Sequence, residues 1–408
     1  MSTRSSSTFA RRAGSLFMAL LLFAGCATTP QGRRLPTPPL MQAEEEVPEE
    51  LLLDVGIVPL DPGHIRAGGR DPDPTSPQIR AAESHFIAFH LKETMQRTAH
   101  WGAVRVVPEN METSDLIIRG RIFRSTGERL HVGFMAQDAT GRVWLDREYH
   151  VEVDGRDYLA AASENREPFQ TIYTRFANEL ARILMTLTPE QRKTIRATAQ
   201  MRFAAEFAPD AFGDYVVRER QIYRIVRLPA DDDPMMERLM RIRDRENMFI
   251  DTLDEYYEAF YRRMQPEYEN WRRYSQTELE ALAQVRRSSM GRIAGGLVLI
   301  AAAVALEMAG VENTASLRDV LILSGGMVVI DGVNISQQSD MHRAGIEELS
   351  QSFSADMENV VVDFEGRRVE LTGTAQEQFE QWREILRELW EEETGFGPGG
   401  DAGAAGIL

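Results

Sequence analysis

The 408-residue chain has a single cysteine, Cys26, and this scarcity excludes several kinds of chemistry. One cysteine cannot form an internal disulfide, and it cannot supply the thiolate ligands of a cysteine zinc site. Basic residues are also outnumbered, with 46 lysines and arginines against 63 acids and a net charge of −17. Because phosphate neutralisation needs a basic surface, we expect no nucleic acid partner.

The sequence also lacks an apolar run of the length that a single membrane span needs, about 20 residues. One shorter run lies near the amino terminus, where Arg4, Arg11 and Arg12 precede the apolar stretch 13–24. A basic start, a short apolar core and small residues at its end are typical of a secretion signal. Residues 1–25 are therefore predicted to be a signal peptide.

The residues that close this stretch resemble a known processing site. Phe23-Ala24-Gly25-Cys26 has one large apolar residue, two small residues and a cysteine, an order that is similar to the lipobox of bacterial lipoproteins. The resemblance implies cleavage before Cys26 and acylation of that residue, and several acyl chains hold a protein firmly at a membrane. The alternative is an ordinary signal peptide with an incidental cysteine.

The mature chain is expected at the outer membrane, facing the periplasm. Ala27 and Thr28 follow the cysteine, without the aspartate that resembles an inner-membrane retention signal. Removal of residues 1–25 takes away three arginines and no acids, which leaves a net charge of −20. Residues 26–50 are rich in proline and glutamate and have little to bury, so they predict a flexible tether between the lipid anchor and the folded part.

Residues 51–156 predict a small α+β domain. An apolar strand over 51–60 is followed by a helix over 77–99, for which Ser76 is the N-cap and Pro77 the first residue. A strand over 104–107 and three further strands up to residue 153 complete the pattern. Strand, helix and strand followed by a three-stranded meander indicate a helix layer packed on a sheet.

Three segments of this domain carry a resemblance. They are Trp101-Gly102-Ala103-Val104-Arg105-Val106-Val107, Asp115-Leu116-Ile117-Ile118-Arg119-Gly120 and Asp138-Ala139-Thr140-Gly141-Arg142-Val143-Trp144. Together they resemble the periplasmic domain shared by curli-secretion lipoproteins, penicillin-binding-protein activator lipoproteins and the N-terminal part of the Tol-system propeller protein. The resemblance covers about one quarter of the chain and implies an assembly or docking module without catalysis.

Residues 157–290 predict a helical domain, whose last two helices run over 234–264 and 266–290. These helices carry many aromatic side chains, namely Tyr256, Tyr257, Phe260, Tyr261, Tyr268, Trp271 and Tyr274. At helical spacing, such residues are more often used in packing than in binding. We therefore expect them to pack between helices, with a glycan-binding surface as the alternative.

Residues 291–335 predict an apolar helical hairpin with small residues on one face. Two apolar runs, 293–306 and 320–330, are separated by a polar turn. Small residues four apart let two helix backbones approach closely, and the candidate positions for membrane contact or self-association are Gly291, Gly295, Ala301, Ala305, Gly325 and Gly326. The hairpin is either buried within the protein or meets the membrane and copies of itself.

The remaining residues predict a helix, a β-hairpin and an amphipathic helix over 336–394, followed by a disordered tail over 395–408. The β-hairpin is expected over 360–371, and Thr374 with Glu377 forms a capping box at the start of the last helix. The short run Asp231-Asp232-Asp233 lacks the alternating ligands of a calcium loop, so it is interpreted as a solvated loop before a helix.

No catalytic motif is found, and no cofactor or metal ion is expected. His85 and His90 are five residues apart and face different sides of a helix, while His131 and His150 have no acidic or histidine partner near them in the sequence. The first hypothesis is a non-enzymatic outer-membrane lipoprotein that docks an envelope protein or copies of itself. The alternatives are an oligomeric pore or export component that uses residues 293–330, and an envelope glycan hydrolase.

Overall fold

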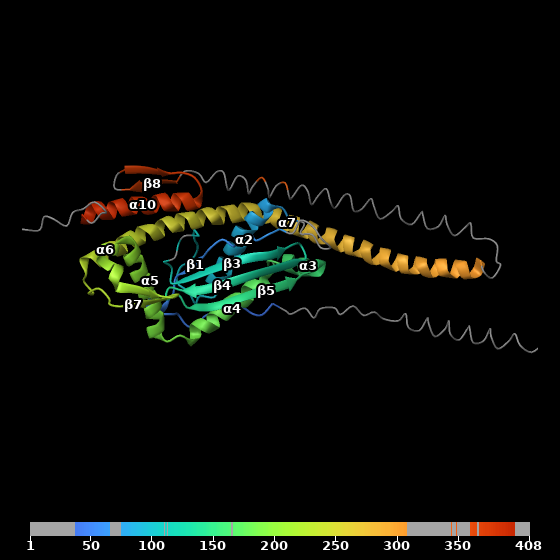
Figure 1. The fold of residues 1–408 in the computed structure, drawn as a ribbon, viewed down its shortest axis with the longest axis horizontal. Coiled ribbons are helices and arrows are strands. Elements are labelled where there is room, and N and C mark those ends of the chain that lie inside the picture. Colours follow the sequence, from blue (N-terminus) through green and yellow to red (C-terminus); the bar gives the residue numbers. More distant parts are fainter. Residues whose placement is uncertain are drawn as a thin grey trace, which may run out of the picture. The chain divides into compact units, whose positions relative to one another are not determined.

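The computed structural model describes residues 37–65 and 75–307 except 110, 112 and 165, and then residues 344, 348, 360–364 and 367–395. Residues from Pro38 onward form one compact unit. Its described part has a mixed α+β fold with seven α-helices and a five-stranded sheet (Figure 1). The predicted α+β class is confirmed at this level.

The five-stranded sheet has the order β2-β1-β3-β4-β5. Its strands are β1 (Val55–Ile57), β2 (Val104–Val106), β3 (Leu116–Ser125), β4 (Arg129–Asp138) and β5 (Val143–Glu152). The short β1 is parallel to both β2 and β3, and β3, β4 and β5 form an antiparallel meander. Strand β1 is shorter than the predicted 51–60. The chain that follows it stays beside β3, because the amides of Val58 and Asp61 donate to carbonyls of β3 and Asp61 forms an isolated bridge with Arg121.

Helices α2 (Pro77–Gln96) and α4 (Gln170–Thr186) cover one face of this sheet. The amide of Ile79 donates a hydrogen bond to Oγ of Ser76 at 3.2 Å, which confirms the predicted N-cap. Phe176 of α4 packs on Phe134 of β4 with ring centroids 4.8 Å apart. Leu130, Val132, Phe134 and Ala136 of β4 are all buried under this helix layer.

Helix α7 (Pro234–Glu307) is a single helix where the sequence predicted two. Asp233 accepts hydrogen bonds from the amides of Met235 and Met236 at 2.9 and 3.1 Å and so caps its first turn. Pro266 lies inside the helix and does not end it. An internal proline costs about 3 kcal/mol, and buried side chains on both sides of it, among them Met264 and Tyr268, hold the helix in place.

Several aromatic side chains of α7 pack against α2, namely Tyr257, Phe260, Tyr261 and Tyr268. Tyr261 and Tyr268 are buried and lie 4.7 and 4.4 Å from the ring of Phe86, measured between ring centroids. Trp271 is fully buried as well. Packing between helices is thus the role of these residues, and the glycan-binding interpretation is wrong for them.

A cluster of buried charged residues also joins α7 to the sheet and its helices. Arg272 of α7 forms ion pairs with Glu167, which precedes α4, and with Glu83 of α2 at 3.6 Å. The same Glu83 carboxylate accepts hydrogen bonds from Ser125 at 2.5 Å and from Tyr268 at 2.6 Å. Arg80 of α2 also pairs with Glu83, at 3.1 Å, so that two arginines balance two glutamates. Arg272 is 1 % exposed and Glu83 0 %, so these charges neutralise each other out of contact with water.

Helix α10 (Ala375–Thr394) packs on the first half of α7. Before it, β8 (Val360–Phe364) and β9 (Arg367–Leu371) pair antiparallel, and Thr374 with Glu377 forms a capping box at the start of α10. Trp382 of α10 lies 5.5 Å from Phe249 of α7 between ring centroids. Arg383 pairs with Glu246 of α7 at 2.8 Å.

A β-hairpin interrupts the predicted helical domain. Beside the helices α3 (Gly155–Ser163), α5 (Pro189–Phe207) and α6 (Pro209–Phe212), the chain forms β6 (Val216–Glu219) and β7 (Ile222–Ile225). Arg220 adopts a φ of 62° in the turn between them. Valine and isoleucine favour extended backbone, and the amide of Tyr223 donates a hydrogen bond to the carbonyl of Thr140 at 2.7 Å, which fixes the hairpin to the β4–β5 turn.

Part of the predicted tether is bound to the fold. The amide of Ala43 donates to the carbonyl of Thr98 at 2.9 Å, and Asn178 of α4 bonds both the amide of Met41 and the carbonyl of Pro39. The predicted tether 26–50 is therefore too long at its C-terminal end, because residues 39–43 lie on the helix layer.

Candidate functional site

The residues that the sequence singled out are only partly within the described structure. Cys26, Gly325, Gly326 and the predicted tail 396–408 lie outside the described residues, as do residues 308–335 of the predicted hairpin and most of the helix predicted after residue 336. The first part of the hairpin continues α7 as helix, with the backbone of Gly291, Gly295, Ala301 and Ala305 in it. Among the residues described, no helix is both long enough and apolar enough to cross a membrane.

The face of the sheet opposite α2 and α4 carries polar side chains. We call it the open sheet face, and it consists of Arg119, Arg121 and Phe123 of β3, Arg129, His131, Gly133 and Met135 of β4, and Asp146, Glu148, His150 and Glu152 of β5. Cross-strand register places them together, because successive residues of a strand alternate between the two faces. The four β5 residues are exposed, so no described segment covers this edge of the face.

Two histidines meet on the open sheet face, which corrects the expectation that they have no partners. His131 and His150 are directly opposite each other, with ring centroids 5.7 Å apart. Nε2 of His131 lies 2.8 Å from a carboxylate oxygen of Glu148, and Nε2 of His150 lies 3.5 Å from one of Glu152. The contacts of His131 with Glu148 and His150 cross from β4 to the next strand, so they depend on the register of the hairpin. His150 and Glu152 are two residues apart on β5, and this spacing is visible in the sequence.

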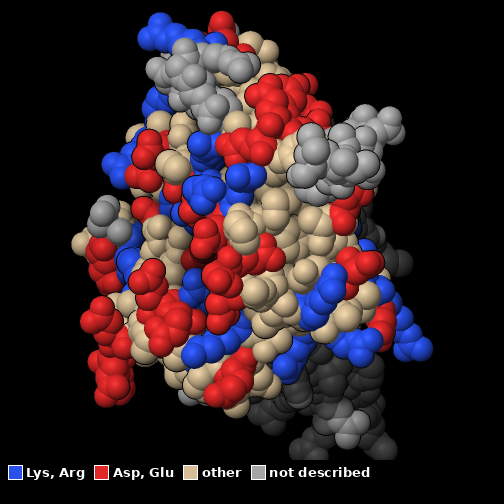
Figure 2. Space-filling model, turned by 90° about the vertical axis from the view of Figure 1, so that its left-hand side faces the viewer, with Lys and Arg blue, Asp and Glu red and all other residues tan. Residues whose placement is uncertain are grey.

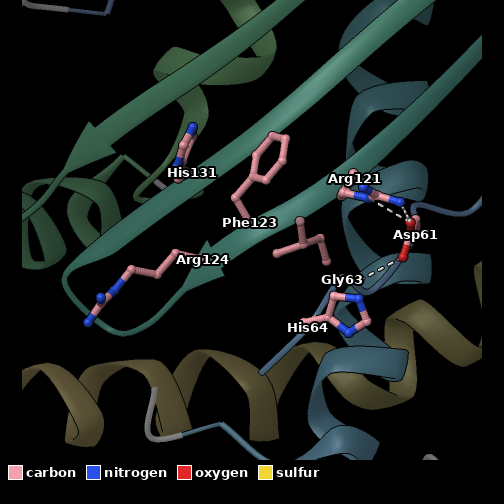
Figure 3. A pocket seen from close by; sticks show the side chains of 8 residues that line it. Asp61, Gly63, His64, Arg121, Phe123, Arg124 and His131 are labelled. Carbon is pink, nitrogen blue, oxygen red and sulfur yellow. Dashed lines mark hydrogen bonds and ion pairs between the residues drawn. The ribbon is translucent and has the colours of Figure 1, made fainter. Parts of the chain in front are cut away.

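A surface pocket of about 640 Å³ opens at one end of this face. Its lining residues are Asp61, Gly63, His64, Arg121, Ile122, Phe123, Arg124 and His131. Figure 3 shows Asp61 and Arg121 together at one end of the pocket and Arg124 with His131 toward the other, with Phe123 between them. The pocket and the two-histidine contact therefore share His131.

The segment after β1 forms one side of the pocket, with Asp61, Gly63 and His64. Gly63 has a φ of 68°, and a Cβ atom there would come within 2.1 Å of the carbonyl oxygen of Ile122, so only glycine fits. The Gly63 amide donates to Oδ1 of Asp61 at 2.8 Å, and Nε of Arg121 donates to Oδ2 at 2.6 Å. The bond from Gly63, with the charge of Arg121, lowers the pKa of Asp61 despite its partial burial.

A β-bulge in β3 places the aromatic side chain of the pocket. The register shifts between Ile122 and Arg124, which leaves Phe123 without a partner on β4. Phe123 is 41 % exposed and packs against His131 at 4.8 Å between ring centroids. Bulges redirect side chains and often occur beside functional surfaces. The exposed ring of Phe123 thus adds an apolar surface among the charged side chains that line the pocket.

The two edges of the sheet differ in how they are covered. At the β2 edge, the amide of Val106 donates to Oδ1 of Asp254 at 2.8 Å, and Arg105 pairs with Asp251, so that α7 occupies this edge. At the β5 edge, no hydrogen bond among the described residues joins the strand's backbone to a segment other than β4. An uncovered edge strand is a template for pairing with another chain.

The described residues contain no group of three or more histidine, aspartate or glutamate side chains that could hold a metal ion. On the face drawn in Figure 2, acidic side chains form several groups with basic and uncharged ones between them. Comparison with models of protein families, with curated proteins and with solved structures finds no match for this chain.

Proposed function

We propose that this chain is a lipid-anchored protein of the bacterial outer membrane that docks an envelope partner through its sheet, without a reaction of its own. The observation that carries this proposal is the uncovered β5 edge beside a polar, uncovered sheet face, at the end of the sheet opposite the covered β2 edge. The face carries charges of both signs, among them Arg129 and Glu152, which pair at 3.1 Å.

The tether supports docking close to the membrane. Twelve residues lie between Cys26 and Pro39, whose carbonyl accepts a hydrogen bond from Asn178 of the helix layer. A fully extended chain of that length spans at most about 45 Å. A lipid at Cys26 would therefore hold Pro39, and the folded part that begins there, within this distance of the bilayer surface, close to other envelope proteins.

Cross-linking of the full-length chain in its native envelope tests the docking function. We expect a defined cross-linked species, either with one envelope protein or with a second copy of the chain, that survives purification in detergent. A photoreactive side chain introduced at Asp146, on the exposed edge, should capture the partner, and one at the exposed Arg273 of α7 serves as the control. A monomer that cross-links to nothing from either position would refute the proposal.

The anchor has its own prediction. A chain that starts at Ala27 and is exported behind an ordinary cleavable signal peptide should be released from the membrane, because it lacks both the acylation site and the apolar residues 13–24. The mature wild-type peptide should begin at Cys26 with added acyl mass. Membrane fractionation and mass spectrometry of the N-terminal peptide measure the two effects. If the chain without Cys26 stayed with the membrane after a carbonate wash, the apolar residues 291–335 and not Cys26 would hold the protein there.

A further inference from the structure

The backbone groups at the β5 edge can be assigned from one hydrogen bond. The amide of Val153 donates to the carbonyl of Glu128 at 2.8 Å, which makes these two residues a hydrogen-bonded pair of the antiparallel ladder. In such a ladder, hydrogen-bonded and non-hydrogen-bonded pairs alternate. The residues of β5 whose amides and carbonyls point away from β4 are therefore Asp146, Glu148, His150 and Glu152.

The side chains of these four residues are exposed. They lie on the open sheet face, and three of them are acidic. On the other face of β5, Leu145 and Val151 are half-buried and Tyr149 is buried, with its hydroxyl donating to Glu179 at 2.8 Å. Arg147 of the same face is exposed and pairs with Glu179 at 2.9 Å. An added strand would thus meet three carboxylates and His150 on one face, and three apolar or aromatic side chains with Arg147 on the other.

A second copy of β5 does not fit this edge. Residues directly opposite each other in an antiparallel pair have side chains on the same face of the sheet. The two-fold axis that relates two copies of β5 must therefore pass through a residue position and not between two residues. If the axis lies at Arg147, Asp146 of one copy is opposite Glu148 of the other. If it lies at Glu148, the two copies of Glu148 are opposite each other. If it lies at Tyr149, Asp146 of one copy is opposite Glu152 of the other. Like charges directly opposite each other are destabilising.

We propose that β5 pairs antiparallel with an extended segment of another protein in which basic and apolar residues alternate. The basic residues lie opposite Asp146, Glu148 and Glu152, and the apolar ones lie beside Leu145, Tyr149 and Val151. The added strand satisfies the outward amides and carbonyls, while the charges set its register. This inference rests on the proposed docking function and names the partner's chemistry at that surface.

Synthetic peptides test the pairing directly on the full-length protein in detergent. The probe is an eight-residue peptide that alternates arginine and valine, and fluorescence anisotropy measures its affinity. N-methylation of two central arginines removes amides that face β5 and should weaken binding by at least about tenfold. N-methylation of two central valines is the matched control and should change it little. Equal loss from both peptides, or equal binding of a peptide with glutamate for arginine, would overturn the proposal.

A substitution in β5 gives the complementary test. Proline at position 148 removes an outward amide but no bond to β4, so we expect Glu148→Pro to keep its unfolding midpoint and to lose about tenfold in peptide affinity. Glu148→Gln keeps the amide and removes only the charge, and should lose about two- to fivefold. His150→Pro repeats the proline test one step along the edge. Unchanged peptide affinity in both folded proline variants would contradict the inference.

The envelope cross-link separates this inference from the function on which it rests. If the partner is captured by the wild-type chain and lost in Glu148→Pro, both stand. If Glu148→Pro still captures the partner, the docking function stands and the β5 pairing is wrong. If neither chain captures anything, the docking function itself fails.

Discussion

Replacement of Arg272 by methionine is expected to lower the free energy of unfolding by about 3–5 kcal/mol, the usual cost of removing one member of a buried ion pair. The variant leaves Glu167 buried without its cation and leaves Glu83 paired with Arg80 alone, while methionine fills most of the volume. Arg272 also lies over the rings of Phe169 and Tyr268, so its loss removes packing as well as charge. Urea unfolding followed by tryptophan fluorescence measures the change.

The neighbouring residue provides the control for this prediction. Arg273 is exposed, and Arg273→Met should change stability by less than about 0.5 kcal/mol. Combining Arg272→Met with Glu167→Gln should recover part of the loss, because one unpaired charge is removed. If the two arginine variants unfolded at the same urea concentration, the buried cluster would not hold α7 on the helix layer.

Replacement of Gly141 by alanine is expected to destabilise the protein by about 2–4 kcal/mol, through backbone strain and a steric clash together. Gly141 has a φ of 88°, and a Cβ atom there would come within 1.9 Å of the carbonyl oxygen of Gln221. The clash should separate the β4–β5 turn from the β6–β7 hairpin. Unfolding measurements give the total cost, and faster hydrogen exchange at the amide of Tyr223 shows where the structure opens.

Substitution of Gly395 distinguishes the cost of backbone strain from the cost of the steric clash. It ends α10 with a φ of 70°, but no atom lies within 4 Å of a Cβ placed there, so Gly395→Ala carries the strain without the clash. We expect it to cost about 1–2 kcal/mol. Equal losses at the two positions, with no change in exchange at Tyr223, would mean that the hairpin does not rest on the turn.

Much of the local structure followed from the sequence because its causes are local. Ser76 and Thr374 cap helices through bonds that reach only three residues along the chain, and both caps are found. The turn over 138–141 rests on Asp138, whose carboxylate accepts hydrogen bonds from the amides of Thr140 and Arg142. Such interactions form between residues within four positions of each other, so a short sequence pattern is enough to predict them.

Pro266 shows where local signals failed. Proline predicts a helix end because it lacks an amide donor and clashes with the preceding turn. The helix continues because α7 lies along α2 over many turns, and buried side chains on both sides of the proline compensate the local cost. This compensation comes from residues distant in sequence, so a local pattern could not predict it.

The arrangement of the open sheet face depended on one irregularity in the sheet. The hydrogen bond between Asp138 and Arg142 sets a register that, if continued, would pair His131 with Tyr149. A shift between Ala136 and Gln137 moves the pairing by one residue, and His131 then lies opposite His150. A one-residue shift changes the face of every opposing side chain, and nothing local in the sequence marks it.

The sequence by itself determined the chemistry available to this protein: one cysteine in a lipobox-like context, an acidic chain, and the elements of an α+β fold. The tertiary structure decided which surfaces those elements leave uncovered. Helix α7 occupies the β2 edge through Asp254, and no described segment occupies the β5 edge. The physical reason is that the coverage of an edge depends on contacts between residues more than a hundred positions apart, whereas strands and caps depend on neighbours.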